Sequence, residues 1–284
     1  MTPPPEPDAV ALKKRRLGRT GILVTEVGVG GANLTADEAG EDALLAAFAL
    51  GVNFVETGRA YKGSEYLIGG ALAQSPNKND VHVASKTLAR SRDGALSDLE
   101  RSLQHLRLQA IDVYQLNSVG RGDWPQVMSD GGALQGLQEA REQGLLRFIG
   151  ISSHSLSVLR WAIESGEFDT VQVKWGAFHS NSAGVIRFAR ERDVGVIGMK
   201  PFGGFGMFGS LKGSDFEKTL SAATLLQYAL ANVDLSVCIP GVRRPQEVRE
   251  NVRVANSSAG LTDAGKAEIV ERARTFLRAM RPPP

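Results

Sequence analysis

Residues 52–67 read VNFVETGRAYKGSEYL: a short apolar run ends at Glu56, and a turn then leads into a helical stretch that begins near Ser64. A unit of this kind, a strand followed by an amphipathic helix, occurs about eight times along the chain. Most of the strands are short, continuous and rich in branched residues, which is typical of parallel strands that are buried on both faces. Eight such units in succession predict an α/β fold of the (β/α)8 barrel type, rather than an open sheet.

The predicted elements cover most of the chain. The strands are expected at residues 25–31, 52–57, 81–87, 111–116, 148–153, 170–175, 194–200 and 236–241. The helices that follow them are expected near 38–50, 64–74, 94–107, 131–143, 155–165, 182–192, 215–231 and 245–255, with an extra C-terminal helix near 262–278. The segment RRLGRTGILVTEV, residues 15–27, predicts an N-terminal β-hairpin, and capping boxes predict helix starts at Thr35 and at Ser97.

Length and composition favour a single globular domain. A chain of 284 residues is within the range of one α/β barrel, and we expect it at residues 15–280 after a disordered tail at 1–14. The net charge of +2 gives no electrostatic reason for a nucleic-acid or membrane partner, and no apolar run has the length of a membrane span. The partner expected is therefore a small molecule, and the sequence leaves the oligomeric state open.

Cysteine content and the N-terminal segment bear on the compartment. Cys238 is the only cysteine, which excludes an internal disulfide and a cysteine metal cluster. Its apolar neighbours in the run VCIP favour a core role over a reactive thiol. The segment MTPPPEPDAV lacks the apolar region of a signal peptide. These features predict a cytoplasmic protein.

One competing fold is suggested by residues 27–33, VGVGGAN, because with Glu56 they imitate a dinucleotide-binding fingerprint. The third glycine position is held by Asn33, and the next helix is expected to begin only at Thr35. The glycines therefore do not stand at a helix N-terminus, where a pyrophosphate would bind. A tight glycine turn after the first strand is the favoured interpretation.

Polar residues follow the C-terminal ends of most predicted strands, which is where (β/α)8 barrels carry their active sites. These residues are Glu56, Tyr61, Lys86, Asn117, Ser152, Ser153, Gln172, Trp175, Lys200, Gly241 and Arg243. An acid, a phenol and an ammonium from neighbouring strands can meet at one point, where the ammonium would lower the pKa of the phenol from about 10. Each residue alone is more often a cap or a rim residue, but their joint placement favours a catalytic site.

From about Arg16 to Asn256 the sequence resembles the aldo-keto reductase superfamily. The matching stretches, in order, are LGRTGILVTEVGVGG, GVNFVETGRAYKGSEYLIGGAL, SKT, RSLQHLRLQAIDVYQL, FIGISSHS, VQVKW, MKPFGG and IPGVRRPQEVREN. The resemblance implies a (β/α)8 barrel, a nicotinamide cofactor across the barrel mouth, and a tetrad of Asp, Tyr, Lys and His. The tyrosine and lysine fall on Tyr61 and Lys86, whereas Glu56 holds the aspartate position and Asn117 the histidine position.

The two departures from the tetrad have physical consequences. Glutamate keeps the charge of aspartate but adds a methylene, and a misplacement of about an ångström can cost on the order of 100-fold in rate. Asparagine keeps a hydrogen-bond donor for a substrate oxygen but removes a group that titrates near pH 7. We therefore expect Asn117 to polarise a carbonyl without relaying a proton, and the chemistry to be slow or specialised.

The resemblance also implies the contacts with the cofactor. Ser152, Ser153 and Gln172 match the ligands of the nicotinamide carboxamide, and Trp175 takes the place of the tyrosine that stacks on the nicotinamide ring. Lys200, Phe202 and Gly204 belong to a loop that resembles the pyrophosphate-binding segment. The adenosine end falls on Gly241, Arg243, Glu247, Glu250 and Asn251. Arg243 or Arg244 could pair with a 2′-phosphate, which favours NADP(H) over NAD(H).

The substrate is less well defined. Asn33, Arg59, Trp124 and Phe205 lie on loops that are expected to border an aromatic pocket with one cation, which fits a planar or conjugated carbonyl. The four histidines have no metal-ligand spacing, so no metal is expected; His154 stands out because it follows the fifth strand.

The leading interpretation is an NAD(P)H-dependent oxidoreductase that reduces an aldehyde or ketone by hydride transfer, with Tyr61 as general acid, Lys86 lowering its pKa, Glu56 anchoring Lys86 and Asn117 orienting the carbonyl. Two alternatives follow from the altered tetrad. In one, the same barrel is a lyase, isomerase or dehydratase with Glu56 as general base. In the other, it is a regulatory protein that binds the nicotinamide and keeps only vestigial activity.

Overall fold

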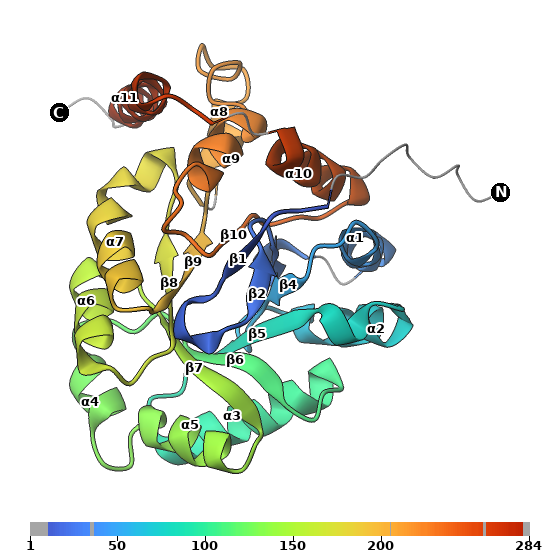
Figure 1. The fold of residues 1–284 in the computed structure, drawn as a ribbon, viewed down its shortest axis with the longest axis vertical. Helices are drawn as coiled ribbons and strands as arrows, with labels where there is room; N and C mark the ends of the chain where they lie inside the picture. The colour runs from blue at the N-terminus through green and yellow to red at the C-terminus, as the bar shows by residue number, and fades with distance from the viewer. Residues whose placement is uncertain (1–10, 35–36, 205, 258–259, 281–284) are drawn as a thin grey trace.

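The computed structural model describes residues 11–34, 37–204, 206–257 and 260–280, and its main feature is an eight-stranded parallel sheet (Figure 1). The strands are β3 Val29–Gly30, β4 Phe54–Glu56, β5 His82–Thr87, β6 Ile111–Leu116, β7 Leu146–Ser152, β8 Thr170–Lys174, β9 Gly195–Met199 and β10 Val237–Ile239. Each strand pairs with the next along the chain. Parallel bridges from Val27 to Cys238 and from Gly30 to Gly241 join the two edges, so the predicted barrel is confirmed.

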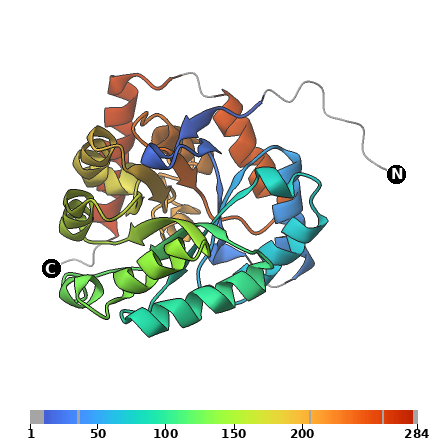
Figure 2. The ribbon, with the colours of Figure 1, turned by 60° about the horizontal axis from the view of Figure 1, so that its bottom comes forward.

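Helices surround the barrel in both views (Figures 1 and 2). They are α1 Glu38–Ala49, α2 Ser64–Gln74, α3 Arg92–Leu106, α4 Trp124–Met128, α5 Ala133–Glu142, α6 Leu156–Ser165, α7 Ala183–Glu191, α8 Met207–Leu211, α9 Ala222–Leu230, α10 Pro245–Ser257 and α11 Asp263–Ala279. The predicted helices are all present, including the extra C-terminal helix, α11. The short helices α4 and α8 lie in loops and were not expected from the sequence.

Two helices begin elsewhere than predicted, because other residues cap them. The hydroxyl of Ser91 accepts a hydrogen bond from the Gly94 amide at 3.3 Å, so α3 starts before Ser97. The hydroxyl of Ser221 accepts from the Thr224 amide at 3.2 Å, so α9 is shorter than predicted and residues 215–220 form turns. Thr35 lies outside the described residues, and at α1 the Asp37 carboxylate accepts from the Gly40 amide at 3.0 Å.

The predicted hairpin consists of β1 Lys14–Arg16 and β2 Leu23–Thr25, which pair antiparallel across the barrel (Figure 1). Its side chains Leu17, Ile22 and Val24 are buried with the apolar residues of the barrel interior. The Arg15 guanidinium donates to the Leu230 carbonyl at 2.8 Å and to Glu26 at 2.7 Å. The hairpin therefore closes one end of the barrel. Residues 1–10 of the predicted tail lie outside the described residues. The prediction of disorder to residue 14 is wrong at its end, because Leu12 is buried in the core and Lys14 begins β1.

The barrel interior consists of two layers with different chemistry. Phe54, Ala84, Val113 and Ile197 belong to one apolar cluster with the hairpin. Two residues further along the same strands stand Glu56, Lys86, Gln115 and Met199, and residues i and i+2 of a strand face the same side. The polar layer thus lies directly on an apolar floor, toward the C-terminal strand ends.

The residues between these positions face outward. Val55, Tyr114, Ile149 and Cys238 are fully buried in a second, larger cluster that includes the inner faces of the helices. Burial raises the pKa of the Cys238 thiol to about 12, which agrees with the predicted core role. Outward-facing strand residues therefore pack the barrel against its helices, while inward-facing residues near the C-terminal strand ends form the polar layer.

The apolar floor should contribute strongly to stability. Leu17 is fully buried, and we expect Leu17→Ala to lower the free energy of unfolding by about 3 kcal/mol through lost burial and a residual cavity. Urea unfolding followed by circular dichroism measures the change. Leu23→Ala is the matched control, because Leu23 lies on the same hairpin and is 54% exposed; it should change stability by less than about 0.5 kcal/mol. Equal losses in both variants would contradict the floor assignment.

Candidate functional site

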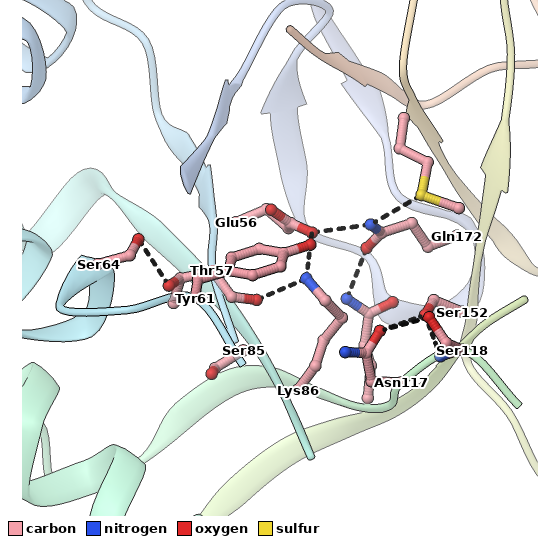
Figure 3. Close-up of polar contacts among 12 residues, drawn as sticks. Glu56, Thr57, Tyr61, Ser64, Ser85, Lys86, Asn117, Ser118, Ser152 and Gln172 are labelled. Atoms are coloured by element: carbon pink, nitrogen blue, oxygen red, sulfur yellow. Dashed lines mark hydrogen bonds and ion pairs between the residues drawn. The ribbon is translucent and has the colours of Figure 1, made fainter. Parts of the chain in front are cut away.

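One carboxylate oxygen connects the predicted catalytic residues. Glu56 ends β4 and is 2% exposed. Its Oε1 accepts hydrogen bonds from Lys86 Nζ, from Gln172 Nε2 at 2.8 Å and, at a long 3.5 Å, from the Tyr61 hydroxyl. Figure 3 shows these side chains pointing toward one another from β4, β5, β8 and the loop after β4. The structure therefore brings Glu56, Tyr61 and Lys86 together, in contact with a predicted cofactor ligand.

Lys86 is buried and depends on its neighbours for its charge. Its ammonium pairs with Glu56, donates to the Thr57 carbonyl at 2.6 Å and lies 4.5 Å from the centre of the Tyr61 ring. Burial lowers the pKa of Lys86, while the Glu56 carboxylate acts in the opposite direction. Loss of the carboxylate would leave a buried charge without an anion, which is strongly destabilising.

The pKa of Tyr61 moves in the direction opposite to the expectation. Burial, followed by the charge of Glu56 and the hydrogen bond to it, raises this pKa well above its ordinary value of 10.0. The predicted lowering by Lys86 is wrong for this arrangement, because the ammonium is paired with Glu56 and lies over the ring, while the hydroxyl faces the carboxylate. Tyr61 is therefore a neutral hydrogen-bond donor at pH 7.

A chain of two amides orients Gln172. Gln115 Nε2 donates to Gln172 Oε1 at 2.8 Å, so the Nε2 of Gln172 is directed toward Glu56. The nearest other acceptor for Gln172 Nε2 is the Met199 thioether at 3.6 Å, which is weak. One N–H of Gln172 is thus available for a stronger acceptor, such as a carboxamide oxygen. Gln115 was not predicted, although it follows the inward-facing Val113 by two residues on β6.

Asn117 follows β6 and offers a donor to the mouth of the barrel. Its Oδ1 accepts from the Ser152 hydroxyl at 3.0 Å and from the Ser118 hydroxyl at 3.2 Å. With the carbonyl side engaged, its amide nitrogen remains to meet a substrate oxygen. Ser153 is less free, because its hydroxyl donates to the Val119 carbonyl at 2.6 Å. Both serines therefore also hold the loop after β6.

Trp175 points away from this group. Its indole nitrogen donates to the Ala229 carbonyl at 3.0 Å, its ring packs on Tyr228 with 5.7 Å between centroids, and the residue is 4% exposed. Gln172 faces inward, so Trp175, three residues on, faces the helices. The expected stacking of Trp175 on a nicotinamide does not fit this placement. Met199, which contacts Gln172, is the inward side chain at this level.

The loop after β9 has the backbone of a glycine-dependent turn. Gly203 and Gly204 have φ 93° and 101°, values that only glycine adopts readily. Lys200 has φ 61°, a left-handed value that is uncommon for a lysine. The Lys200 ammonium lies 3.1 Å from His154 Nε2, and Phe202 packs on Phe208 with 5.4 Å between ring centroids. The predicted pyrophosphate segment is therefore an ordered turn beside the loop after β7.

The predicted adenosine end lies at the start of α10. The Glu247 carboxylate accepts from the Arg243 amide at 2.6 Å, so it closes this turn, and Glu250 is exposed while Asn251 is buried. In the part of the chain that the structure describes, the guanidinium groups of Arg243 and Arg244 have no ion-pair partner. Gly241 packs against Asn33: a side chain at Gly241 would approach Asn33 Nδ2 to 2.5 Å. Two guanidinium groups without an ion-pair partner among the described residues fit a phosphorylated nucleotide, whereas the space beside Gly241 is taken by Asn33.

Two predicted substrate residues lie elsewhere. Arg59 pairs with Glu65 at 2.6 Å and lies 2.8 Å from His105 Nδ1, between the strands and α2 and α3. Trp124 packs against Trp161 and Phe168. The structure does not bring either residue to Glu56, and Phe205 lies outside the described residues.

Two further expectations can be compared with the described residues. Within residues 11–34, 37–204, 206–257 and 260–280, no group of three or more His, Cys, Asp or Glu residues is placed to hold a metal ion. The helices of the same ranges are each too short or too polar to cross a membrane.

Comparison with known proteins agrees with the geometry. The model of the aldo/keto reductase family matches residues 26–220. L-galactose dehydrogenase of Arabidopsis thaliana is 26% identical, with 91% of this chain and 93% of that protein covered. Pyridoxine 4-dehydrogenase of Escherichia coli is 27% identical, with 74% and 78% covered.

Solved structures share the fold. An aldo-keto reductase of Bacillus halodurans in its holo form has a TM-score of 0.77 at 21% identity, and the likeness covers 93% of this chain and 96% of that one. A thermostable aldo-keto reductase solved with the inhibitor epalrestat has a TM-score of 0.73 at 22% identity, with 92% and 100% covered. At this identity the likeness concerns the fold, whereas the family match extends over most of the sequence. The chain belongs to the aldo/keto reductase family.

Proposed function

We propose that the protein reduces an aldehyde or ketone, aromatic or conjugated, with NADPH as the preferred cofactor. The observation that carries this proposal is the single contact group at the barrel mouth, in which Glu56 binds Tyr61, Lys86 and Gln172. The proposed proton donor, the ammonium and the proposed cofactor ligand therefore all contact the same atom, Glu56 Oε1. Residues 15–280 would form one catalytic domain, and its lone buried thiol suits the reducing cytoplasm.

The cofactor would supply the hydride, and the chain would hold it at three places. The free N–H of Gln172, with Ser152 and Ser153, would meet the nicotinamide carboxamide. Lys200, Phe202 and Gly204 would border the pyrophosphate. Gly241, Arg243, Glu247, Glu250 and Asn251 would surround the adenosine, and the unpaired guanidinium groups support a 2′-phosphate there.

The substrate carbonyl would be held by two donors, the Asn117 amide and the Tyr61 hydroxyl, whose one proton would turn from its long contact with Glu56 to the carbonyl oxygen. Tyr61 gives its proton to the oxygen as the carbonyl carbon is reduced. The proton is replaced through Glu56 Oε1, which accepts hydrogen bonds from both Tyr61 and Lys86. One proton leaves Lys86 for Oε1 and one leaves Oε1 for the phenolate, so Glu56 ends as a carboxylate and Lys86 as a neutral amine, which takes up a proton from solvent before the next turnover. Burial, which lowers the pKa of Lys86, favours this release.

The relatives support a small-molecule substrate. Two of them are named as dehydrogenases, one of L-galactose and one of pyridoxine. An alcohol oxidised in the reverse direction would use the same groups, with Tyr61 regaining the proton.

Single-turnover absorbance tests the proposal directly. With protein in excess over NADPH, addition of 4-nitrobenzaldehyde should remove the reduced-cofactor absorbance at about 340 nm, because the activated carbonyl accepts the hydride. Calorimetry establishes beforehand that NADPH is bound. A bound cofactor with a flat trace on this and other carbonyls would overturn the proposal in favour of a non-redox enzyme or a cofactor-binding regulator.

Removal of the Tyr61 hydroxyl should affect chemistry and leave cofactor binding intact. We expect Tyr61→Phe to lower kcat by about 100-fold or more, as for loss of a general acid, with the Kd for NADPH within about twofold of the wild type. Tyr66→Phe is the matched control, because Tyr66 is 58% exposed on α2 and contacts His105. Full activity of Tyr61→Phe would exclude the hydroxyl from the reaction.

The proton path predicts a pH dependence. Reduction should slow at alkaline pH as Lys86 loses its proton, and burial places this pKa below the ordinary 10.5. Glu56→Gln removes both the relay oxygen and the carboxylate that raises the pKa of Lys86, so kcat should fall and the alkaline limb of the remaining activity should move to lower pH. Stopped-flow rates between about pH 6 and pH 10 measure the limb, and thermal melts check folding. If kcat decreases at the same alkaline pH in the wild type and in Glu56→Gln, Lys86 does not supply the proton.

A further inference from the structure

A hollow of about 320 Å³ lies beside the proposed active site, and we call it the rim pocket. It is bordered by the loop after β7, the 3-10 segment Ala177–Ser182 after β8, and α11. Its lining includes His154, Lys174, Phe178, His179, Asn181 and Arg274. These residues come from three separate parts of the chain, and the catalytic group uses none of them.

The rim pocket is positively charged without a matching acid. Lys174 and Arg274 line it, and no carboxylate is present among the described lining residues. Within the described residues, the ion-pair contact of Arg274 is a long one of 3.9 Å to Glu271, a neighbour on α11. Among the described residues Lys174 has no ion-pair partner. Lys200 adds a third cation, since its ammonium lies 3.1 Å from His154.

The two histidines of the rim pocket respond to this charge. Burial, followed by the charges of Lys200 and Lys174, lowers the pKa of His154 to about 4. Burial also lowers the pKa of His179, with Lys174 and Lys200 acting in the same direction. Neutral His154 accepts the hydrogen bond from Lys200 at Nε2, and His179 donates to the Gly203 carbonyl at 3.2 Å. The cations therefore repel one another, and among the described residues only Arg274 has an acid nearby, Glu271 at 3.9 Å.

The rim pocket is close to the reacting group. Lys174 stands two residues after Gln172 on β8, so both face the barrel mouth, and a strand rises about 3.3 Å per residue. The backbone of Lys174 therefore lies roughly 6.6 Å beyond that of Gln172. A proposed cofactor ligand and a cation of the rim pocket therefore stand two residues apart on one strand.

We propose that the rim pocket binds an oxyanion, a carboxylate or phosphate, through Lys174 and Arg274, and that this oxyanion is part of the carbonyl substrate. The assignment to the substrate rests on the proposed reductase function, whereas oxyanion binding itself does not. Lys200 also belongs to the loop expected at the cofactor pyrophosphate, so the cofactor is the other source of the same chemistry. The substrate class is then a short aldehyde or ketone with an acidic group at its far end.

Binding is tested first with inorganic phosphate on the protein without cofactor or substrate. Calorimetry should give saturable binding that weakens about tenfold or more in Lys174→Ala and in Arg274→Ala, each of which removes a charged donor. Lys266→Ala and Arg272→Ala are matched controls on α11, because neither residue lines the rim pocket and each pairs with a nearby acid of the same helix, Asp263 and Glu268. Absence of saturable binding, or equal weakening in the controls, would overturn the proposal whatever the reductase assays show.

The source of the anion is tested with two aldehydes of similar shape and electron demand. The wild type should prefer 4-carboxybenzaldehyde to 4-nitrobenzaldehyde by about tenfold in kcat/KM, and Lys174→Ala should lose this preference while its rate on the nitro compound is kept. Phosphate should compete with the carboxylate substrate and not with NADPH. Phosphate competition with NADPH, together with an unchanged preference in Lys174→Ala, would assign the anion to the cofactor and overturn the substrate assignment.

Discussion

The buried charge of Lys86 is stable inside the barrel because a single oxygen of Glu56 neutralises it. An ammonium without this partner would lie directly above the apolar floor of Phe54 and Ala84, where water cannot solvate it. The other polar groups of the layer are arranged around the same oxygen, since Gln172 and Tyr61 also donate to it. The geometry of the site thus follows from one electrostatic requirement.

Glu56 stands where the resemblance to the family expects an aspartate, and its side chain is longer by one methylene. Its Oε1 lies within hydrogen-bond distance of Gln172 and in a long contact with Tyr61, in addition to Lys86. The phenol consequently faces a negative charge, and its pKa rises. In the proposed reaction the proton path passes through this carboxylate, so the group that anchors Lys86 also takes part in the chemistry.

Patterns along the sequence predict the barrel and the meeting of Glu56, Tyr61 and Lys86, because strand parity and the C-terminal strand ends place all three at one mouth. The same parity could have found Gln115, two residues after Val113. Other features depend on contacts distant in sequence. Arg59 contacts Glu65 and His105 instead of the site, and Trp175 donates to the Ala229 carbonyl. The direction of the shift in the pKa of Tyr61 depends on burial and on the carboxylate that its hydroxyl faces.

The bridges from Val27 to Cys238 and from Gly30 to Gly241 join parts of the chain that are synthesised far apart in time. Until the last strand leaves the ribosome, β3 is an open edge with unpaired backbone groups, and the apolar face of the hairpin lacks Val237 and Ile239 as partners. Such long-range closure slows folding and prolongs the exposure of sheet edges. The nascent chain therefore carries an exposed strand edge, open to pairing with other chains, until β10 has been synthesised.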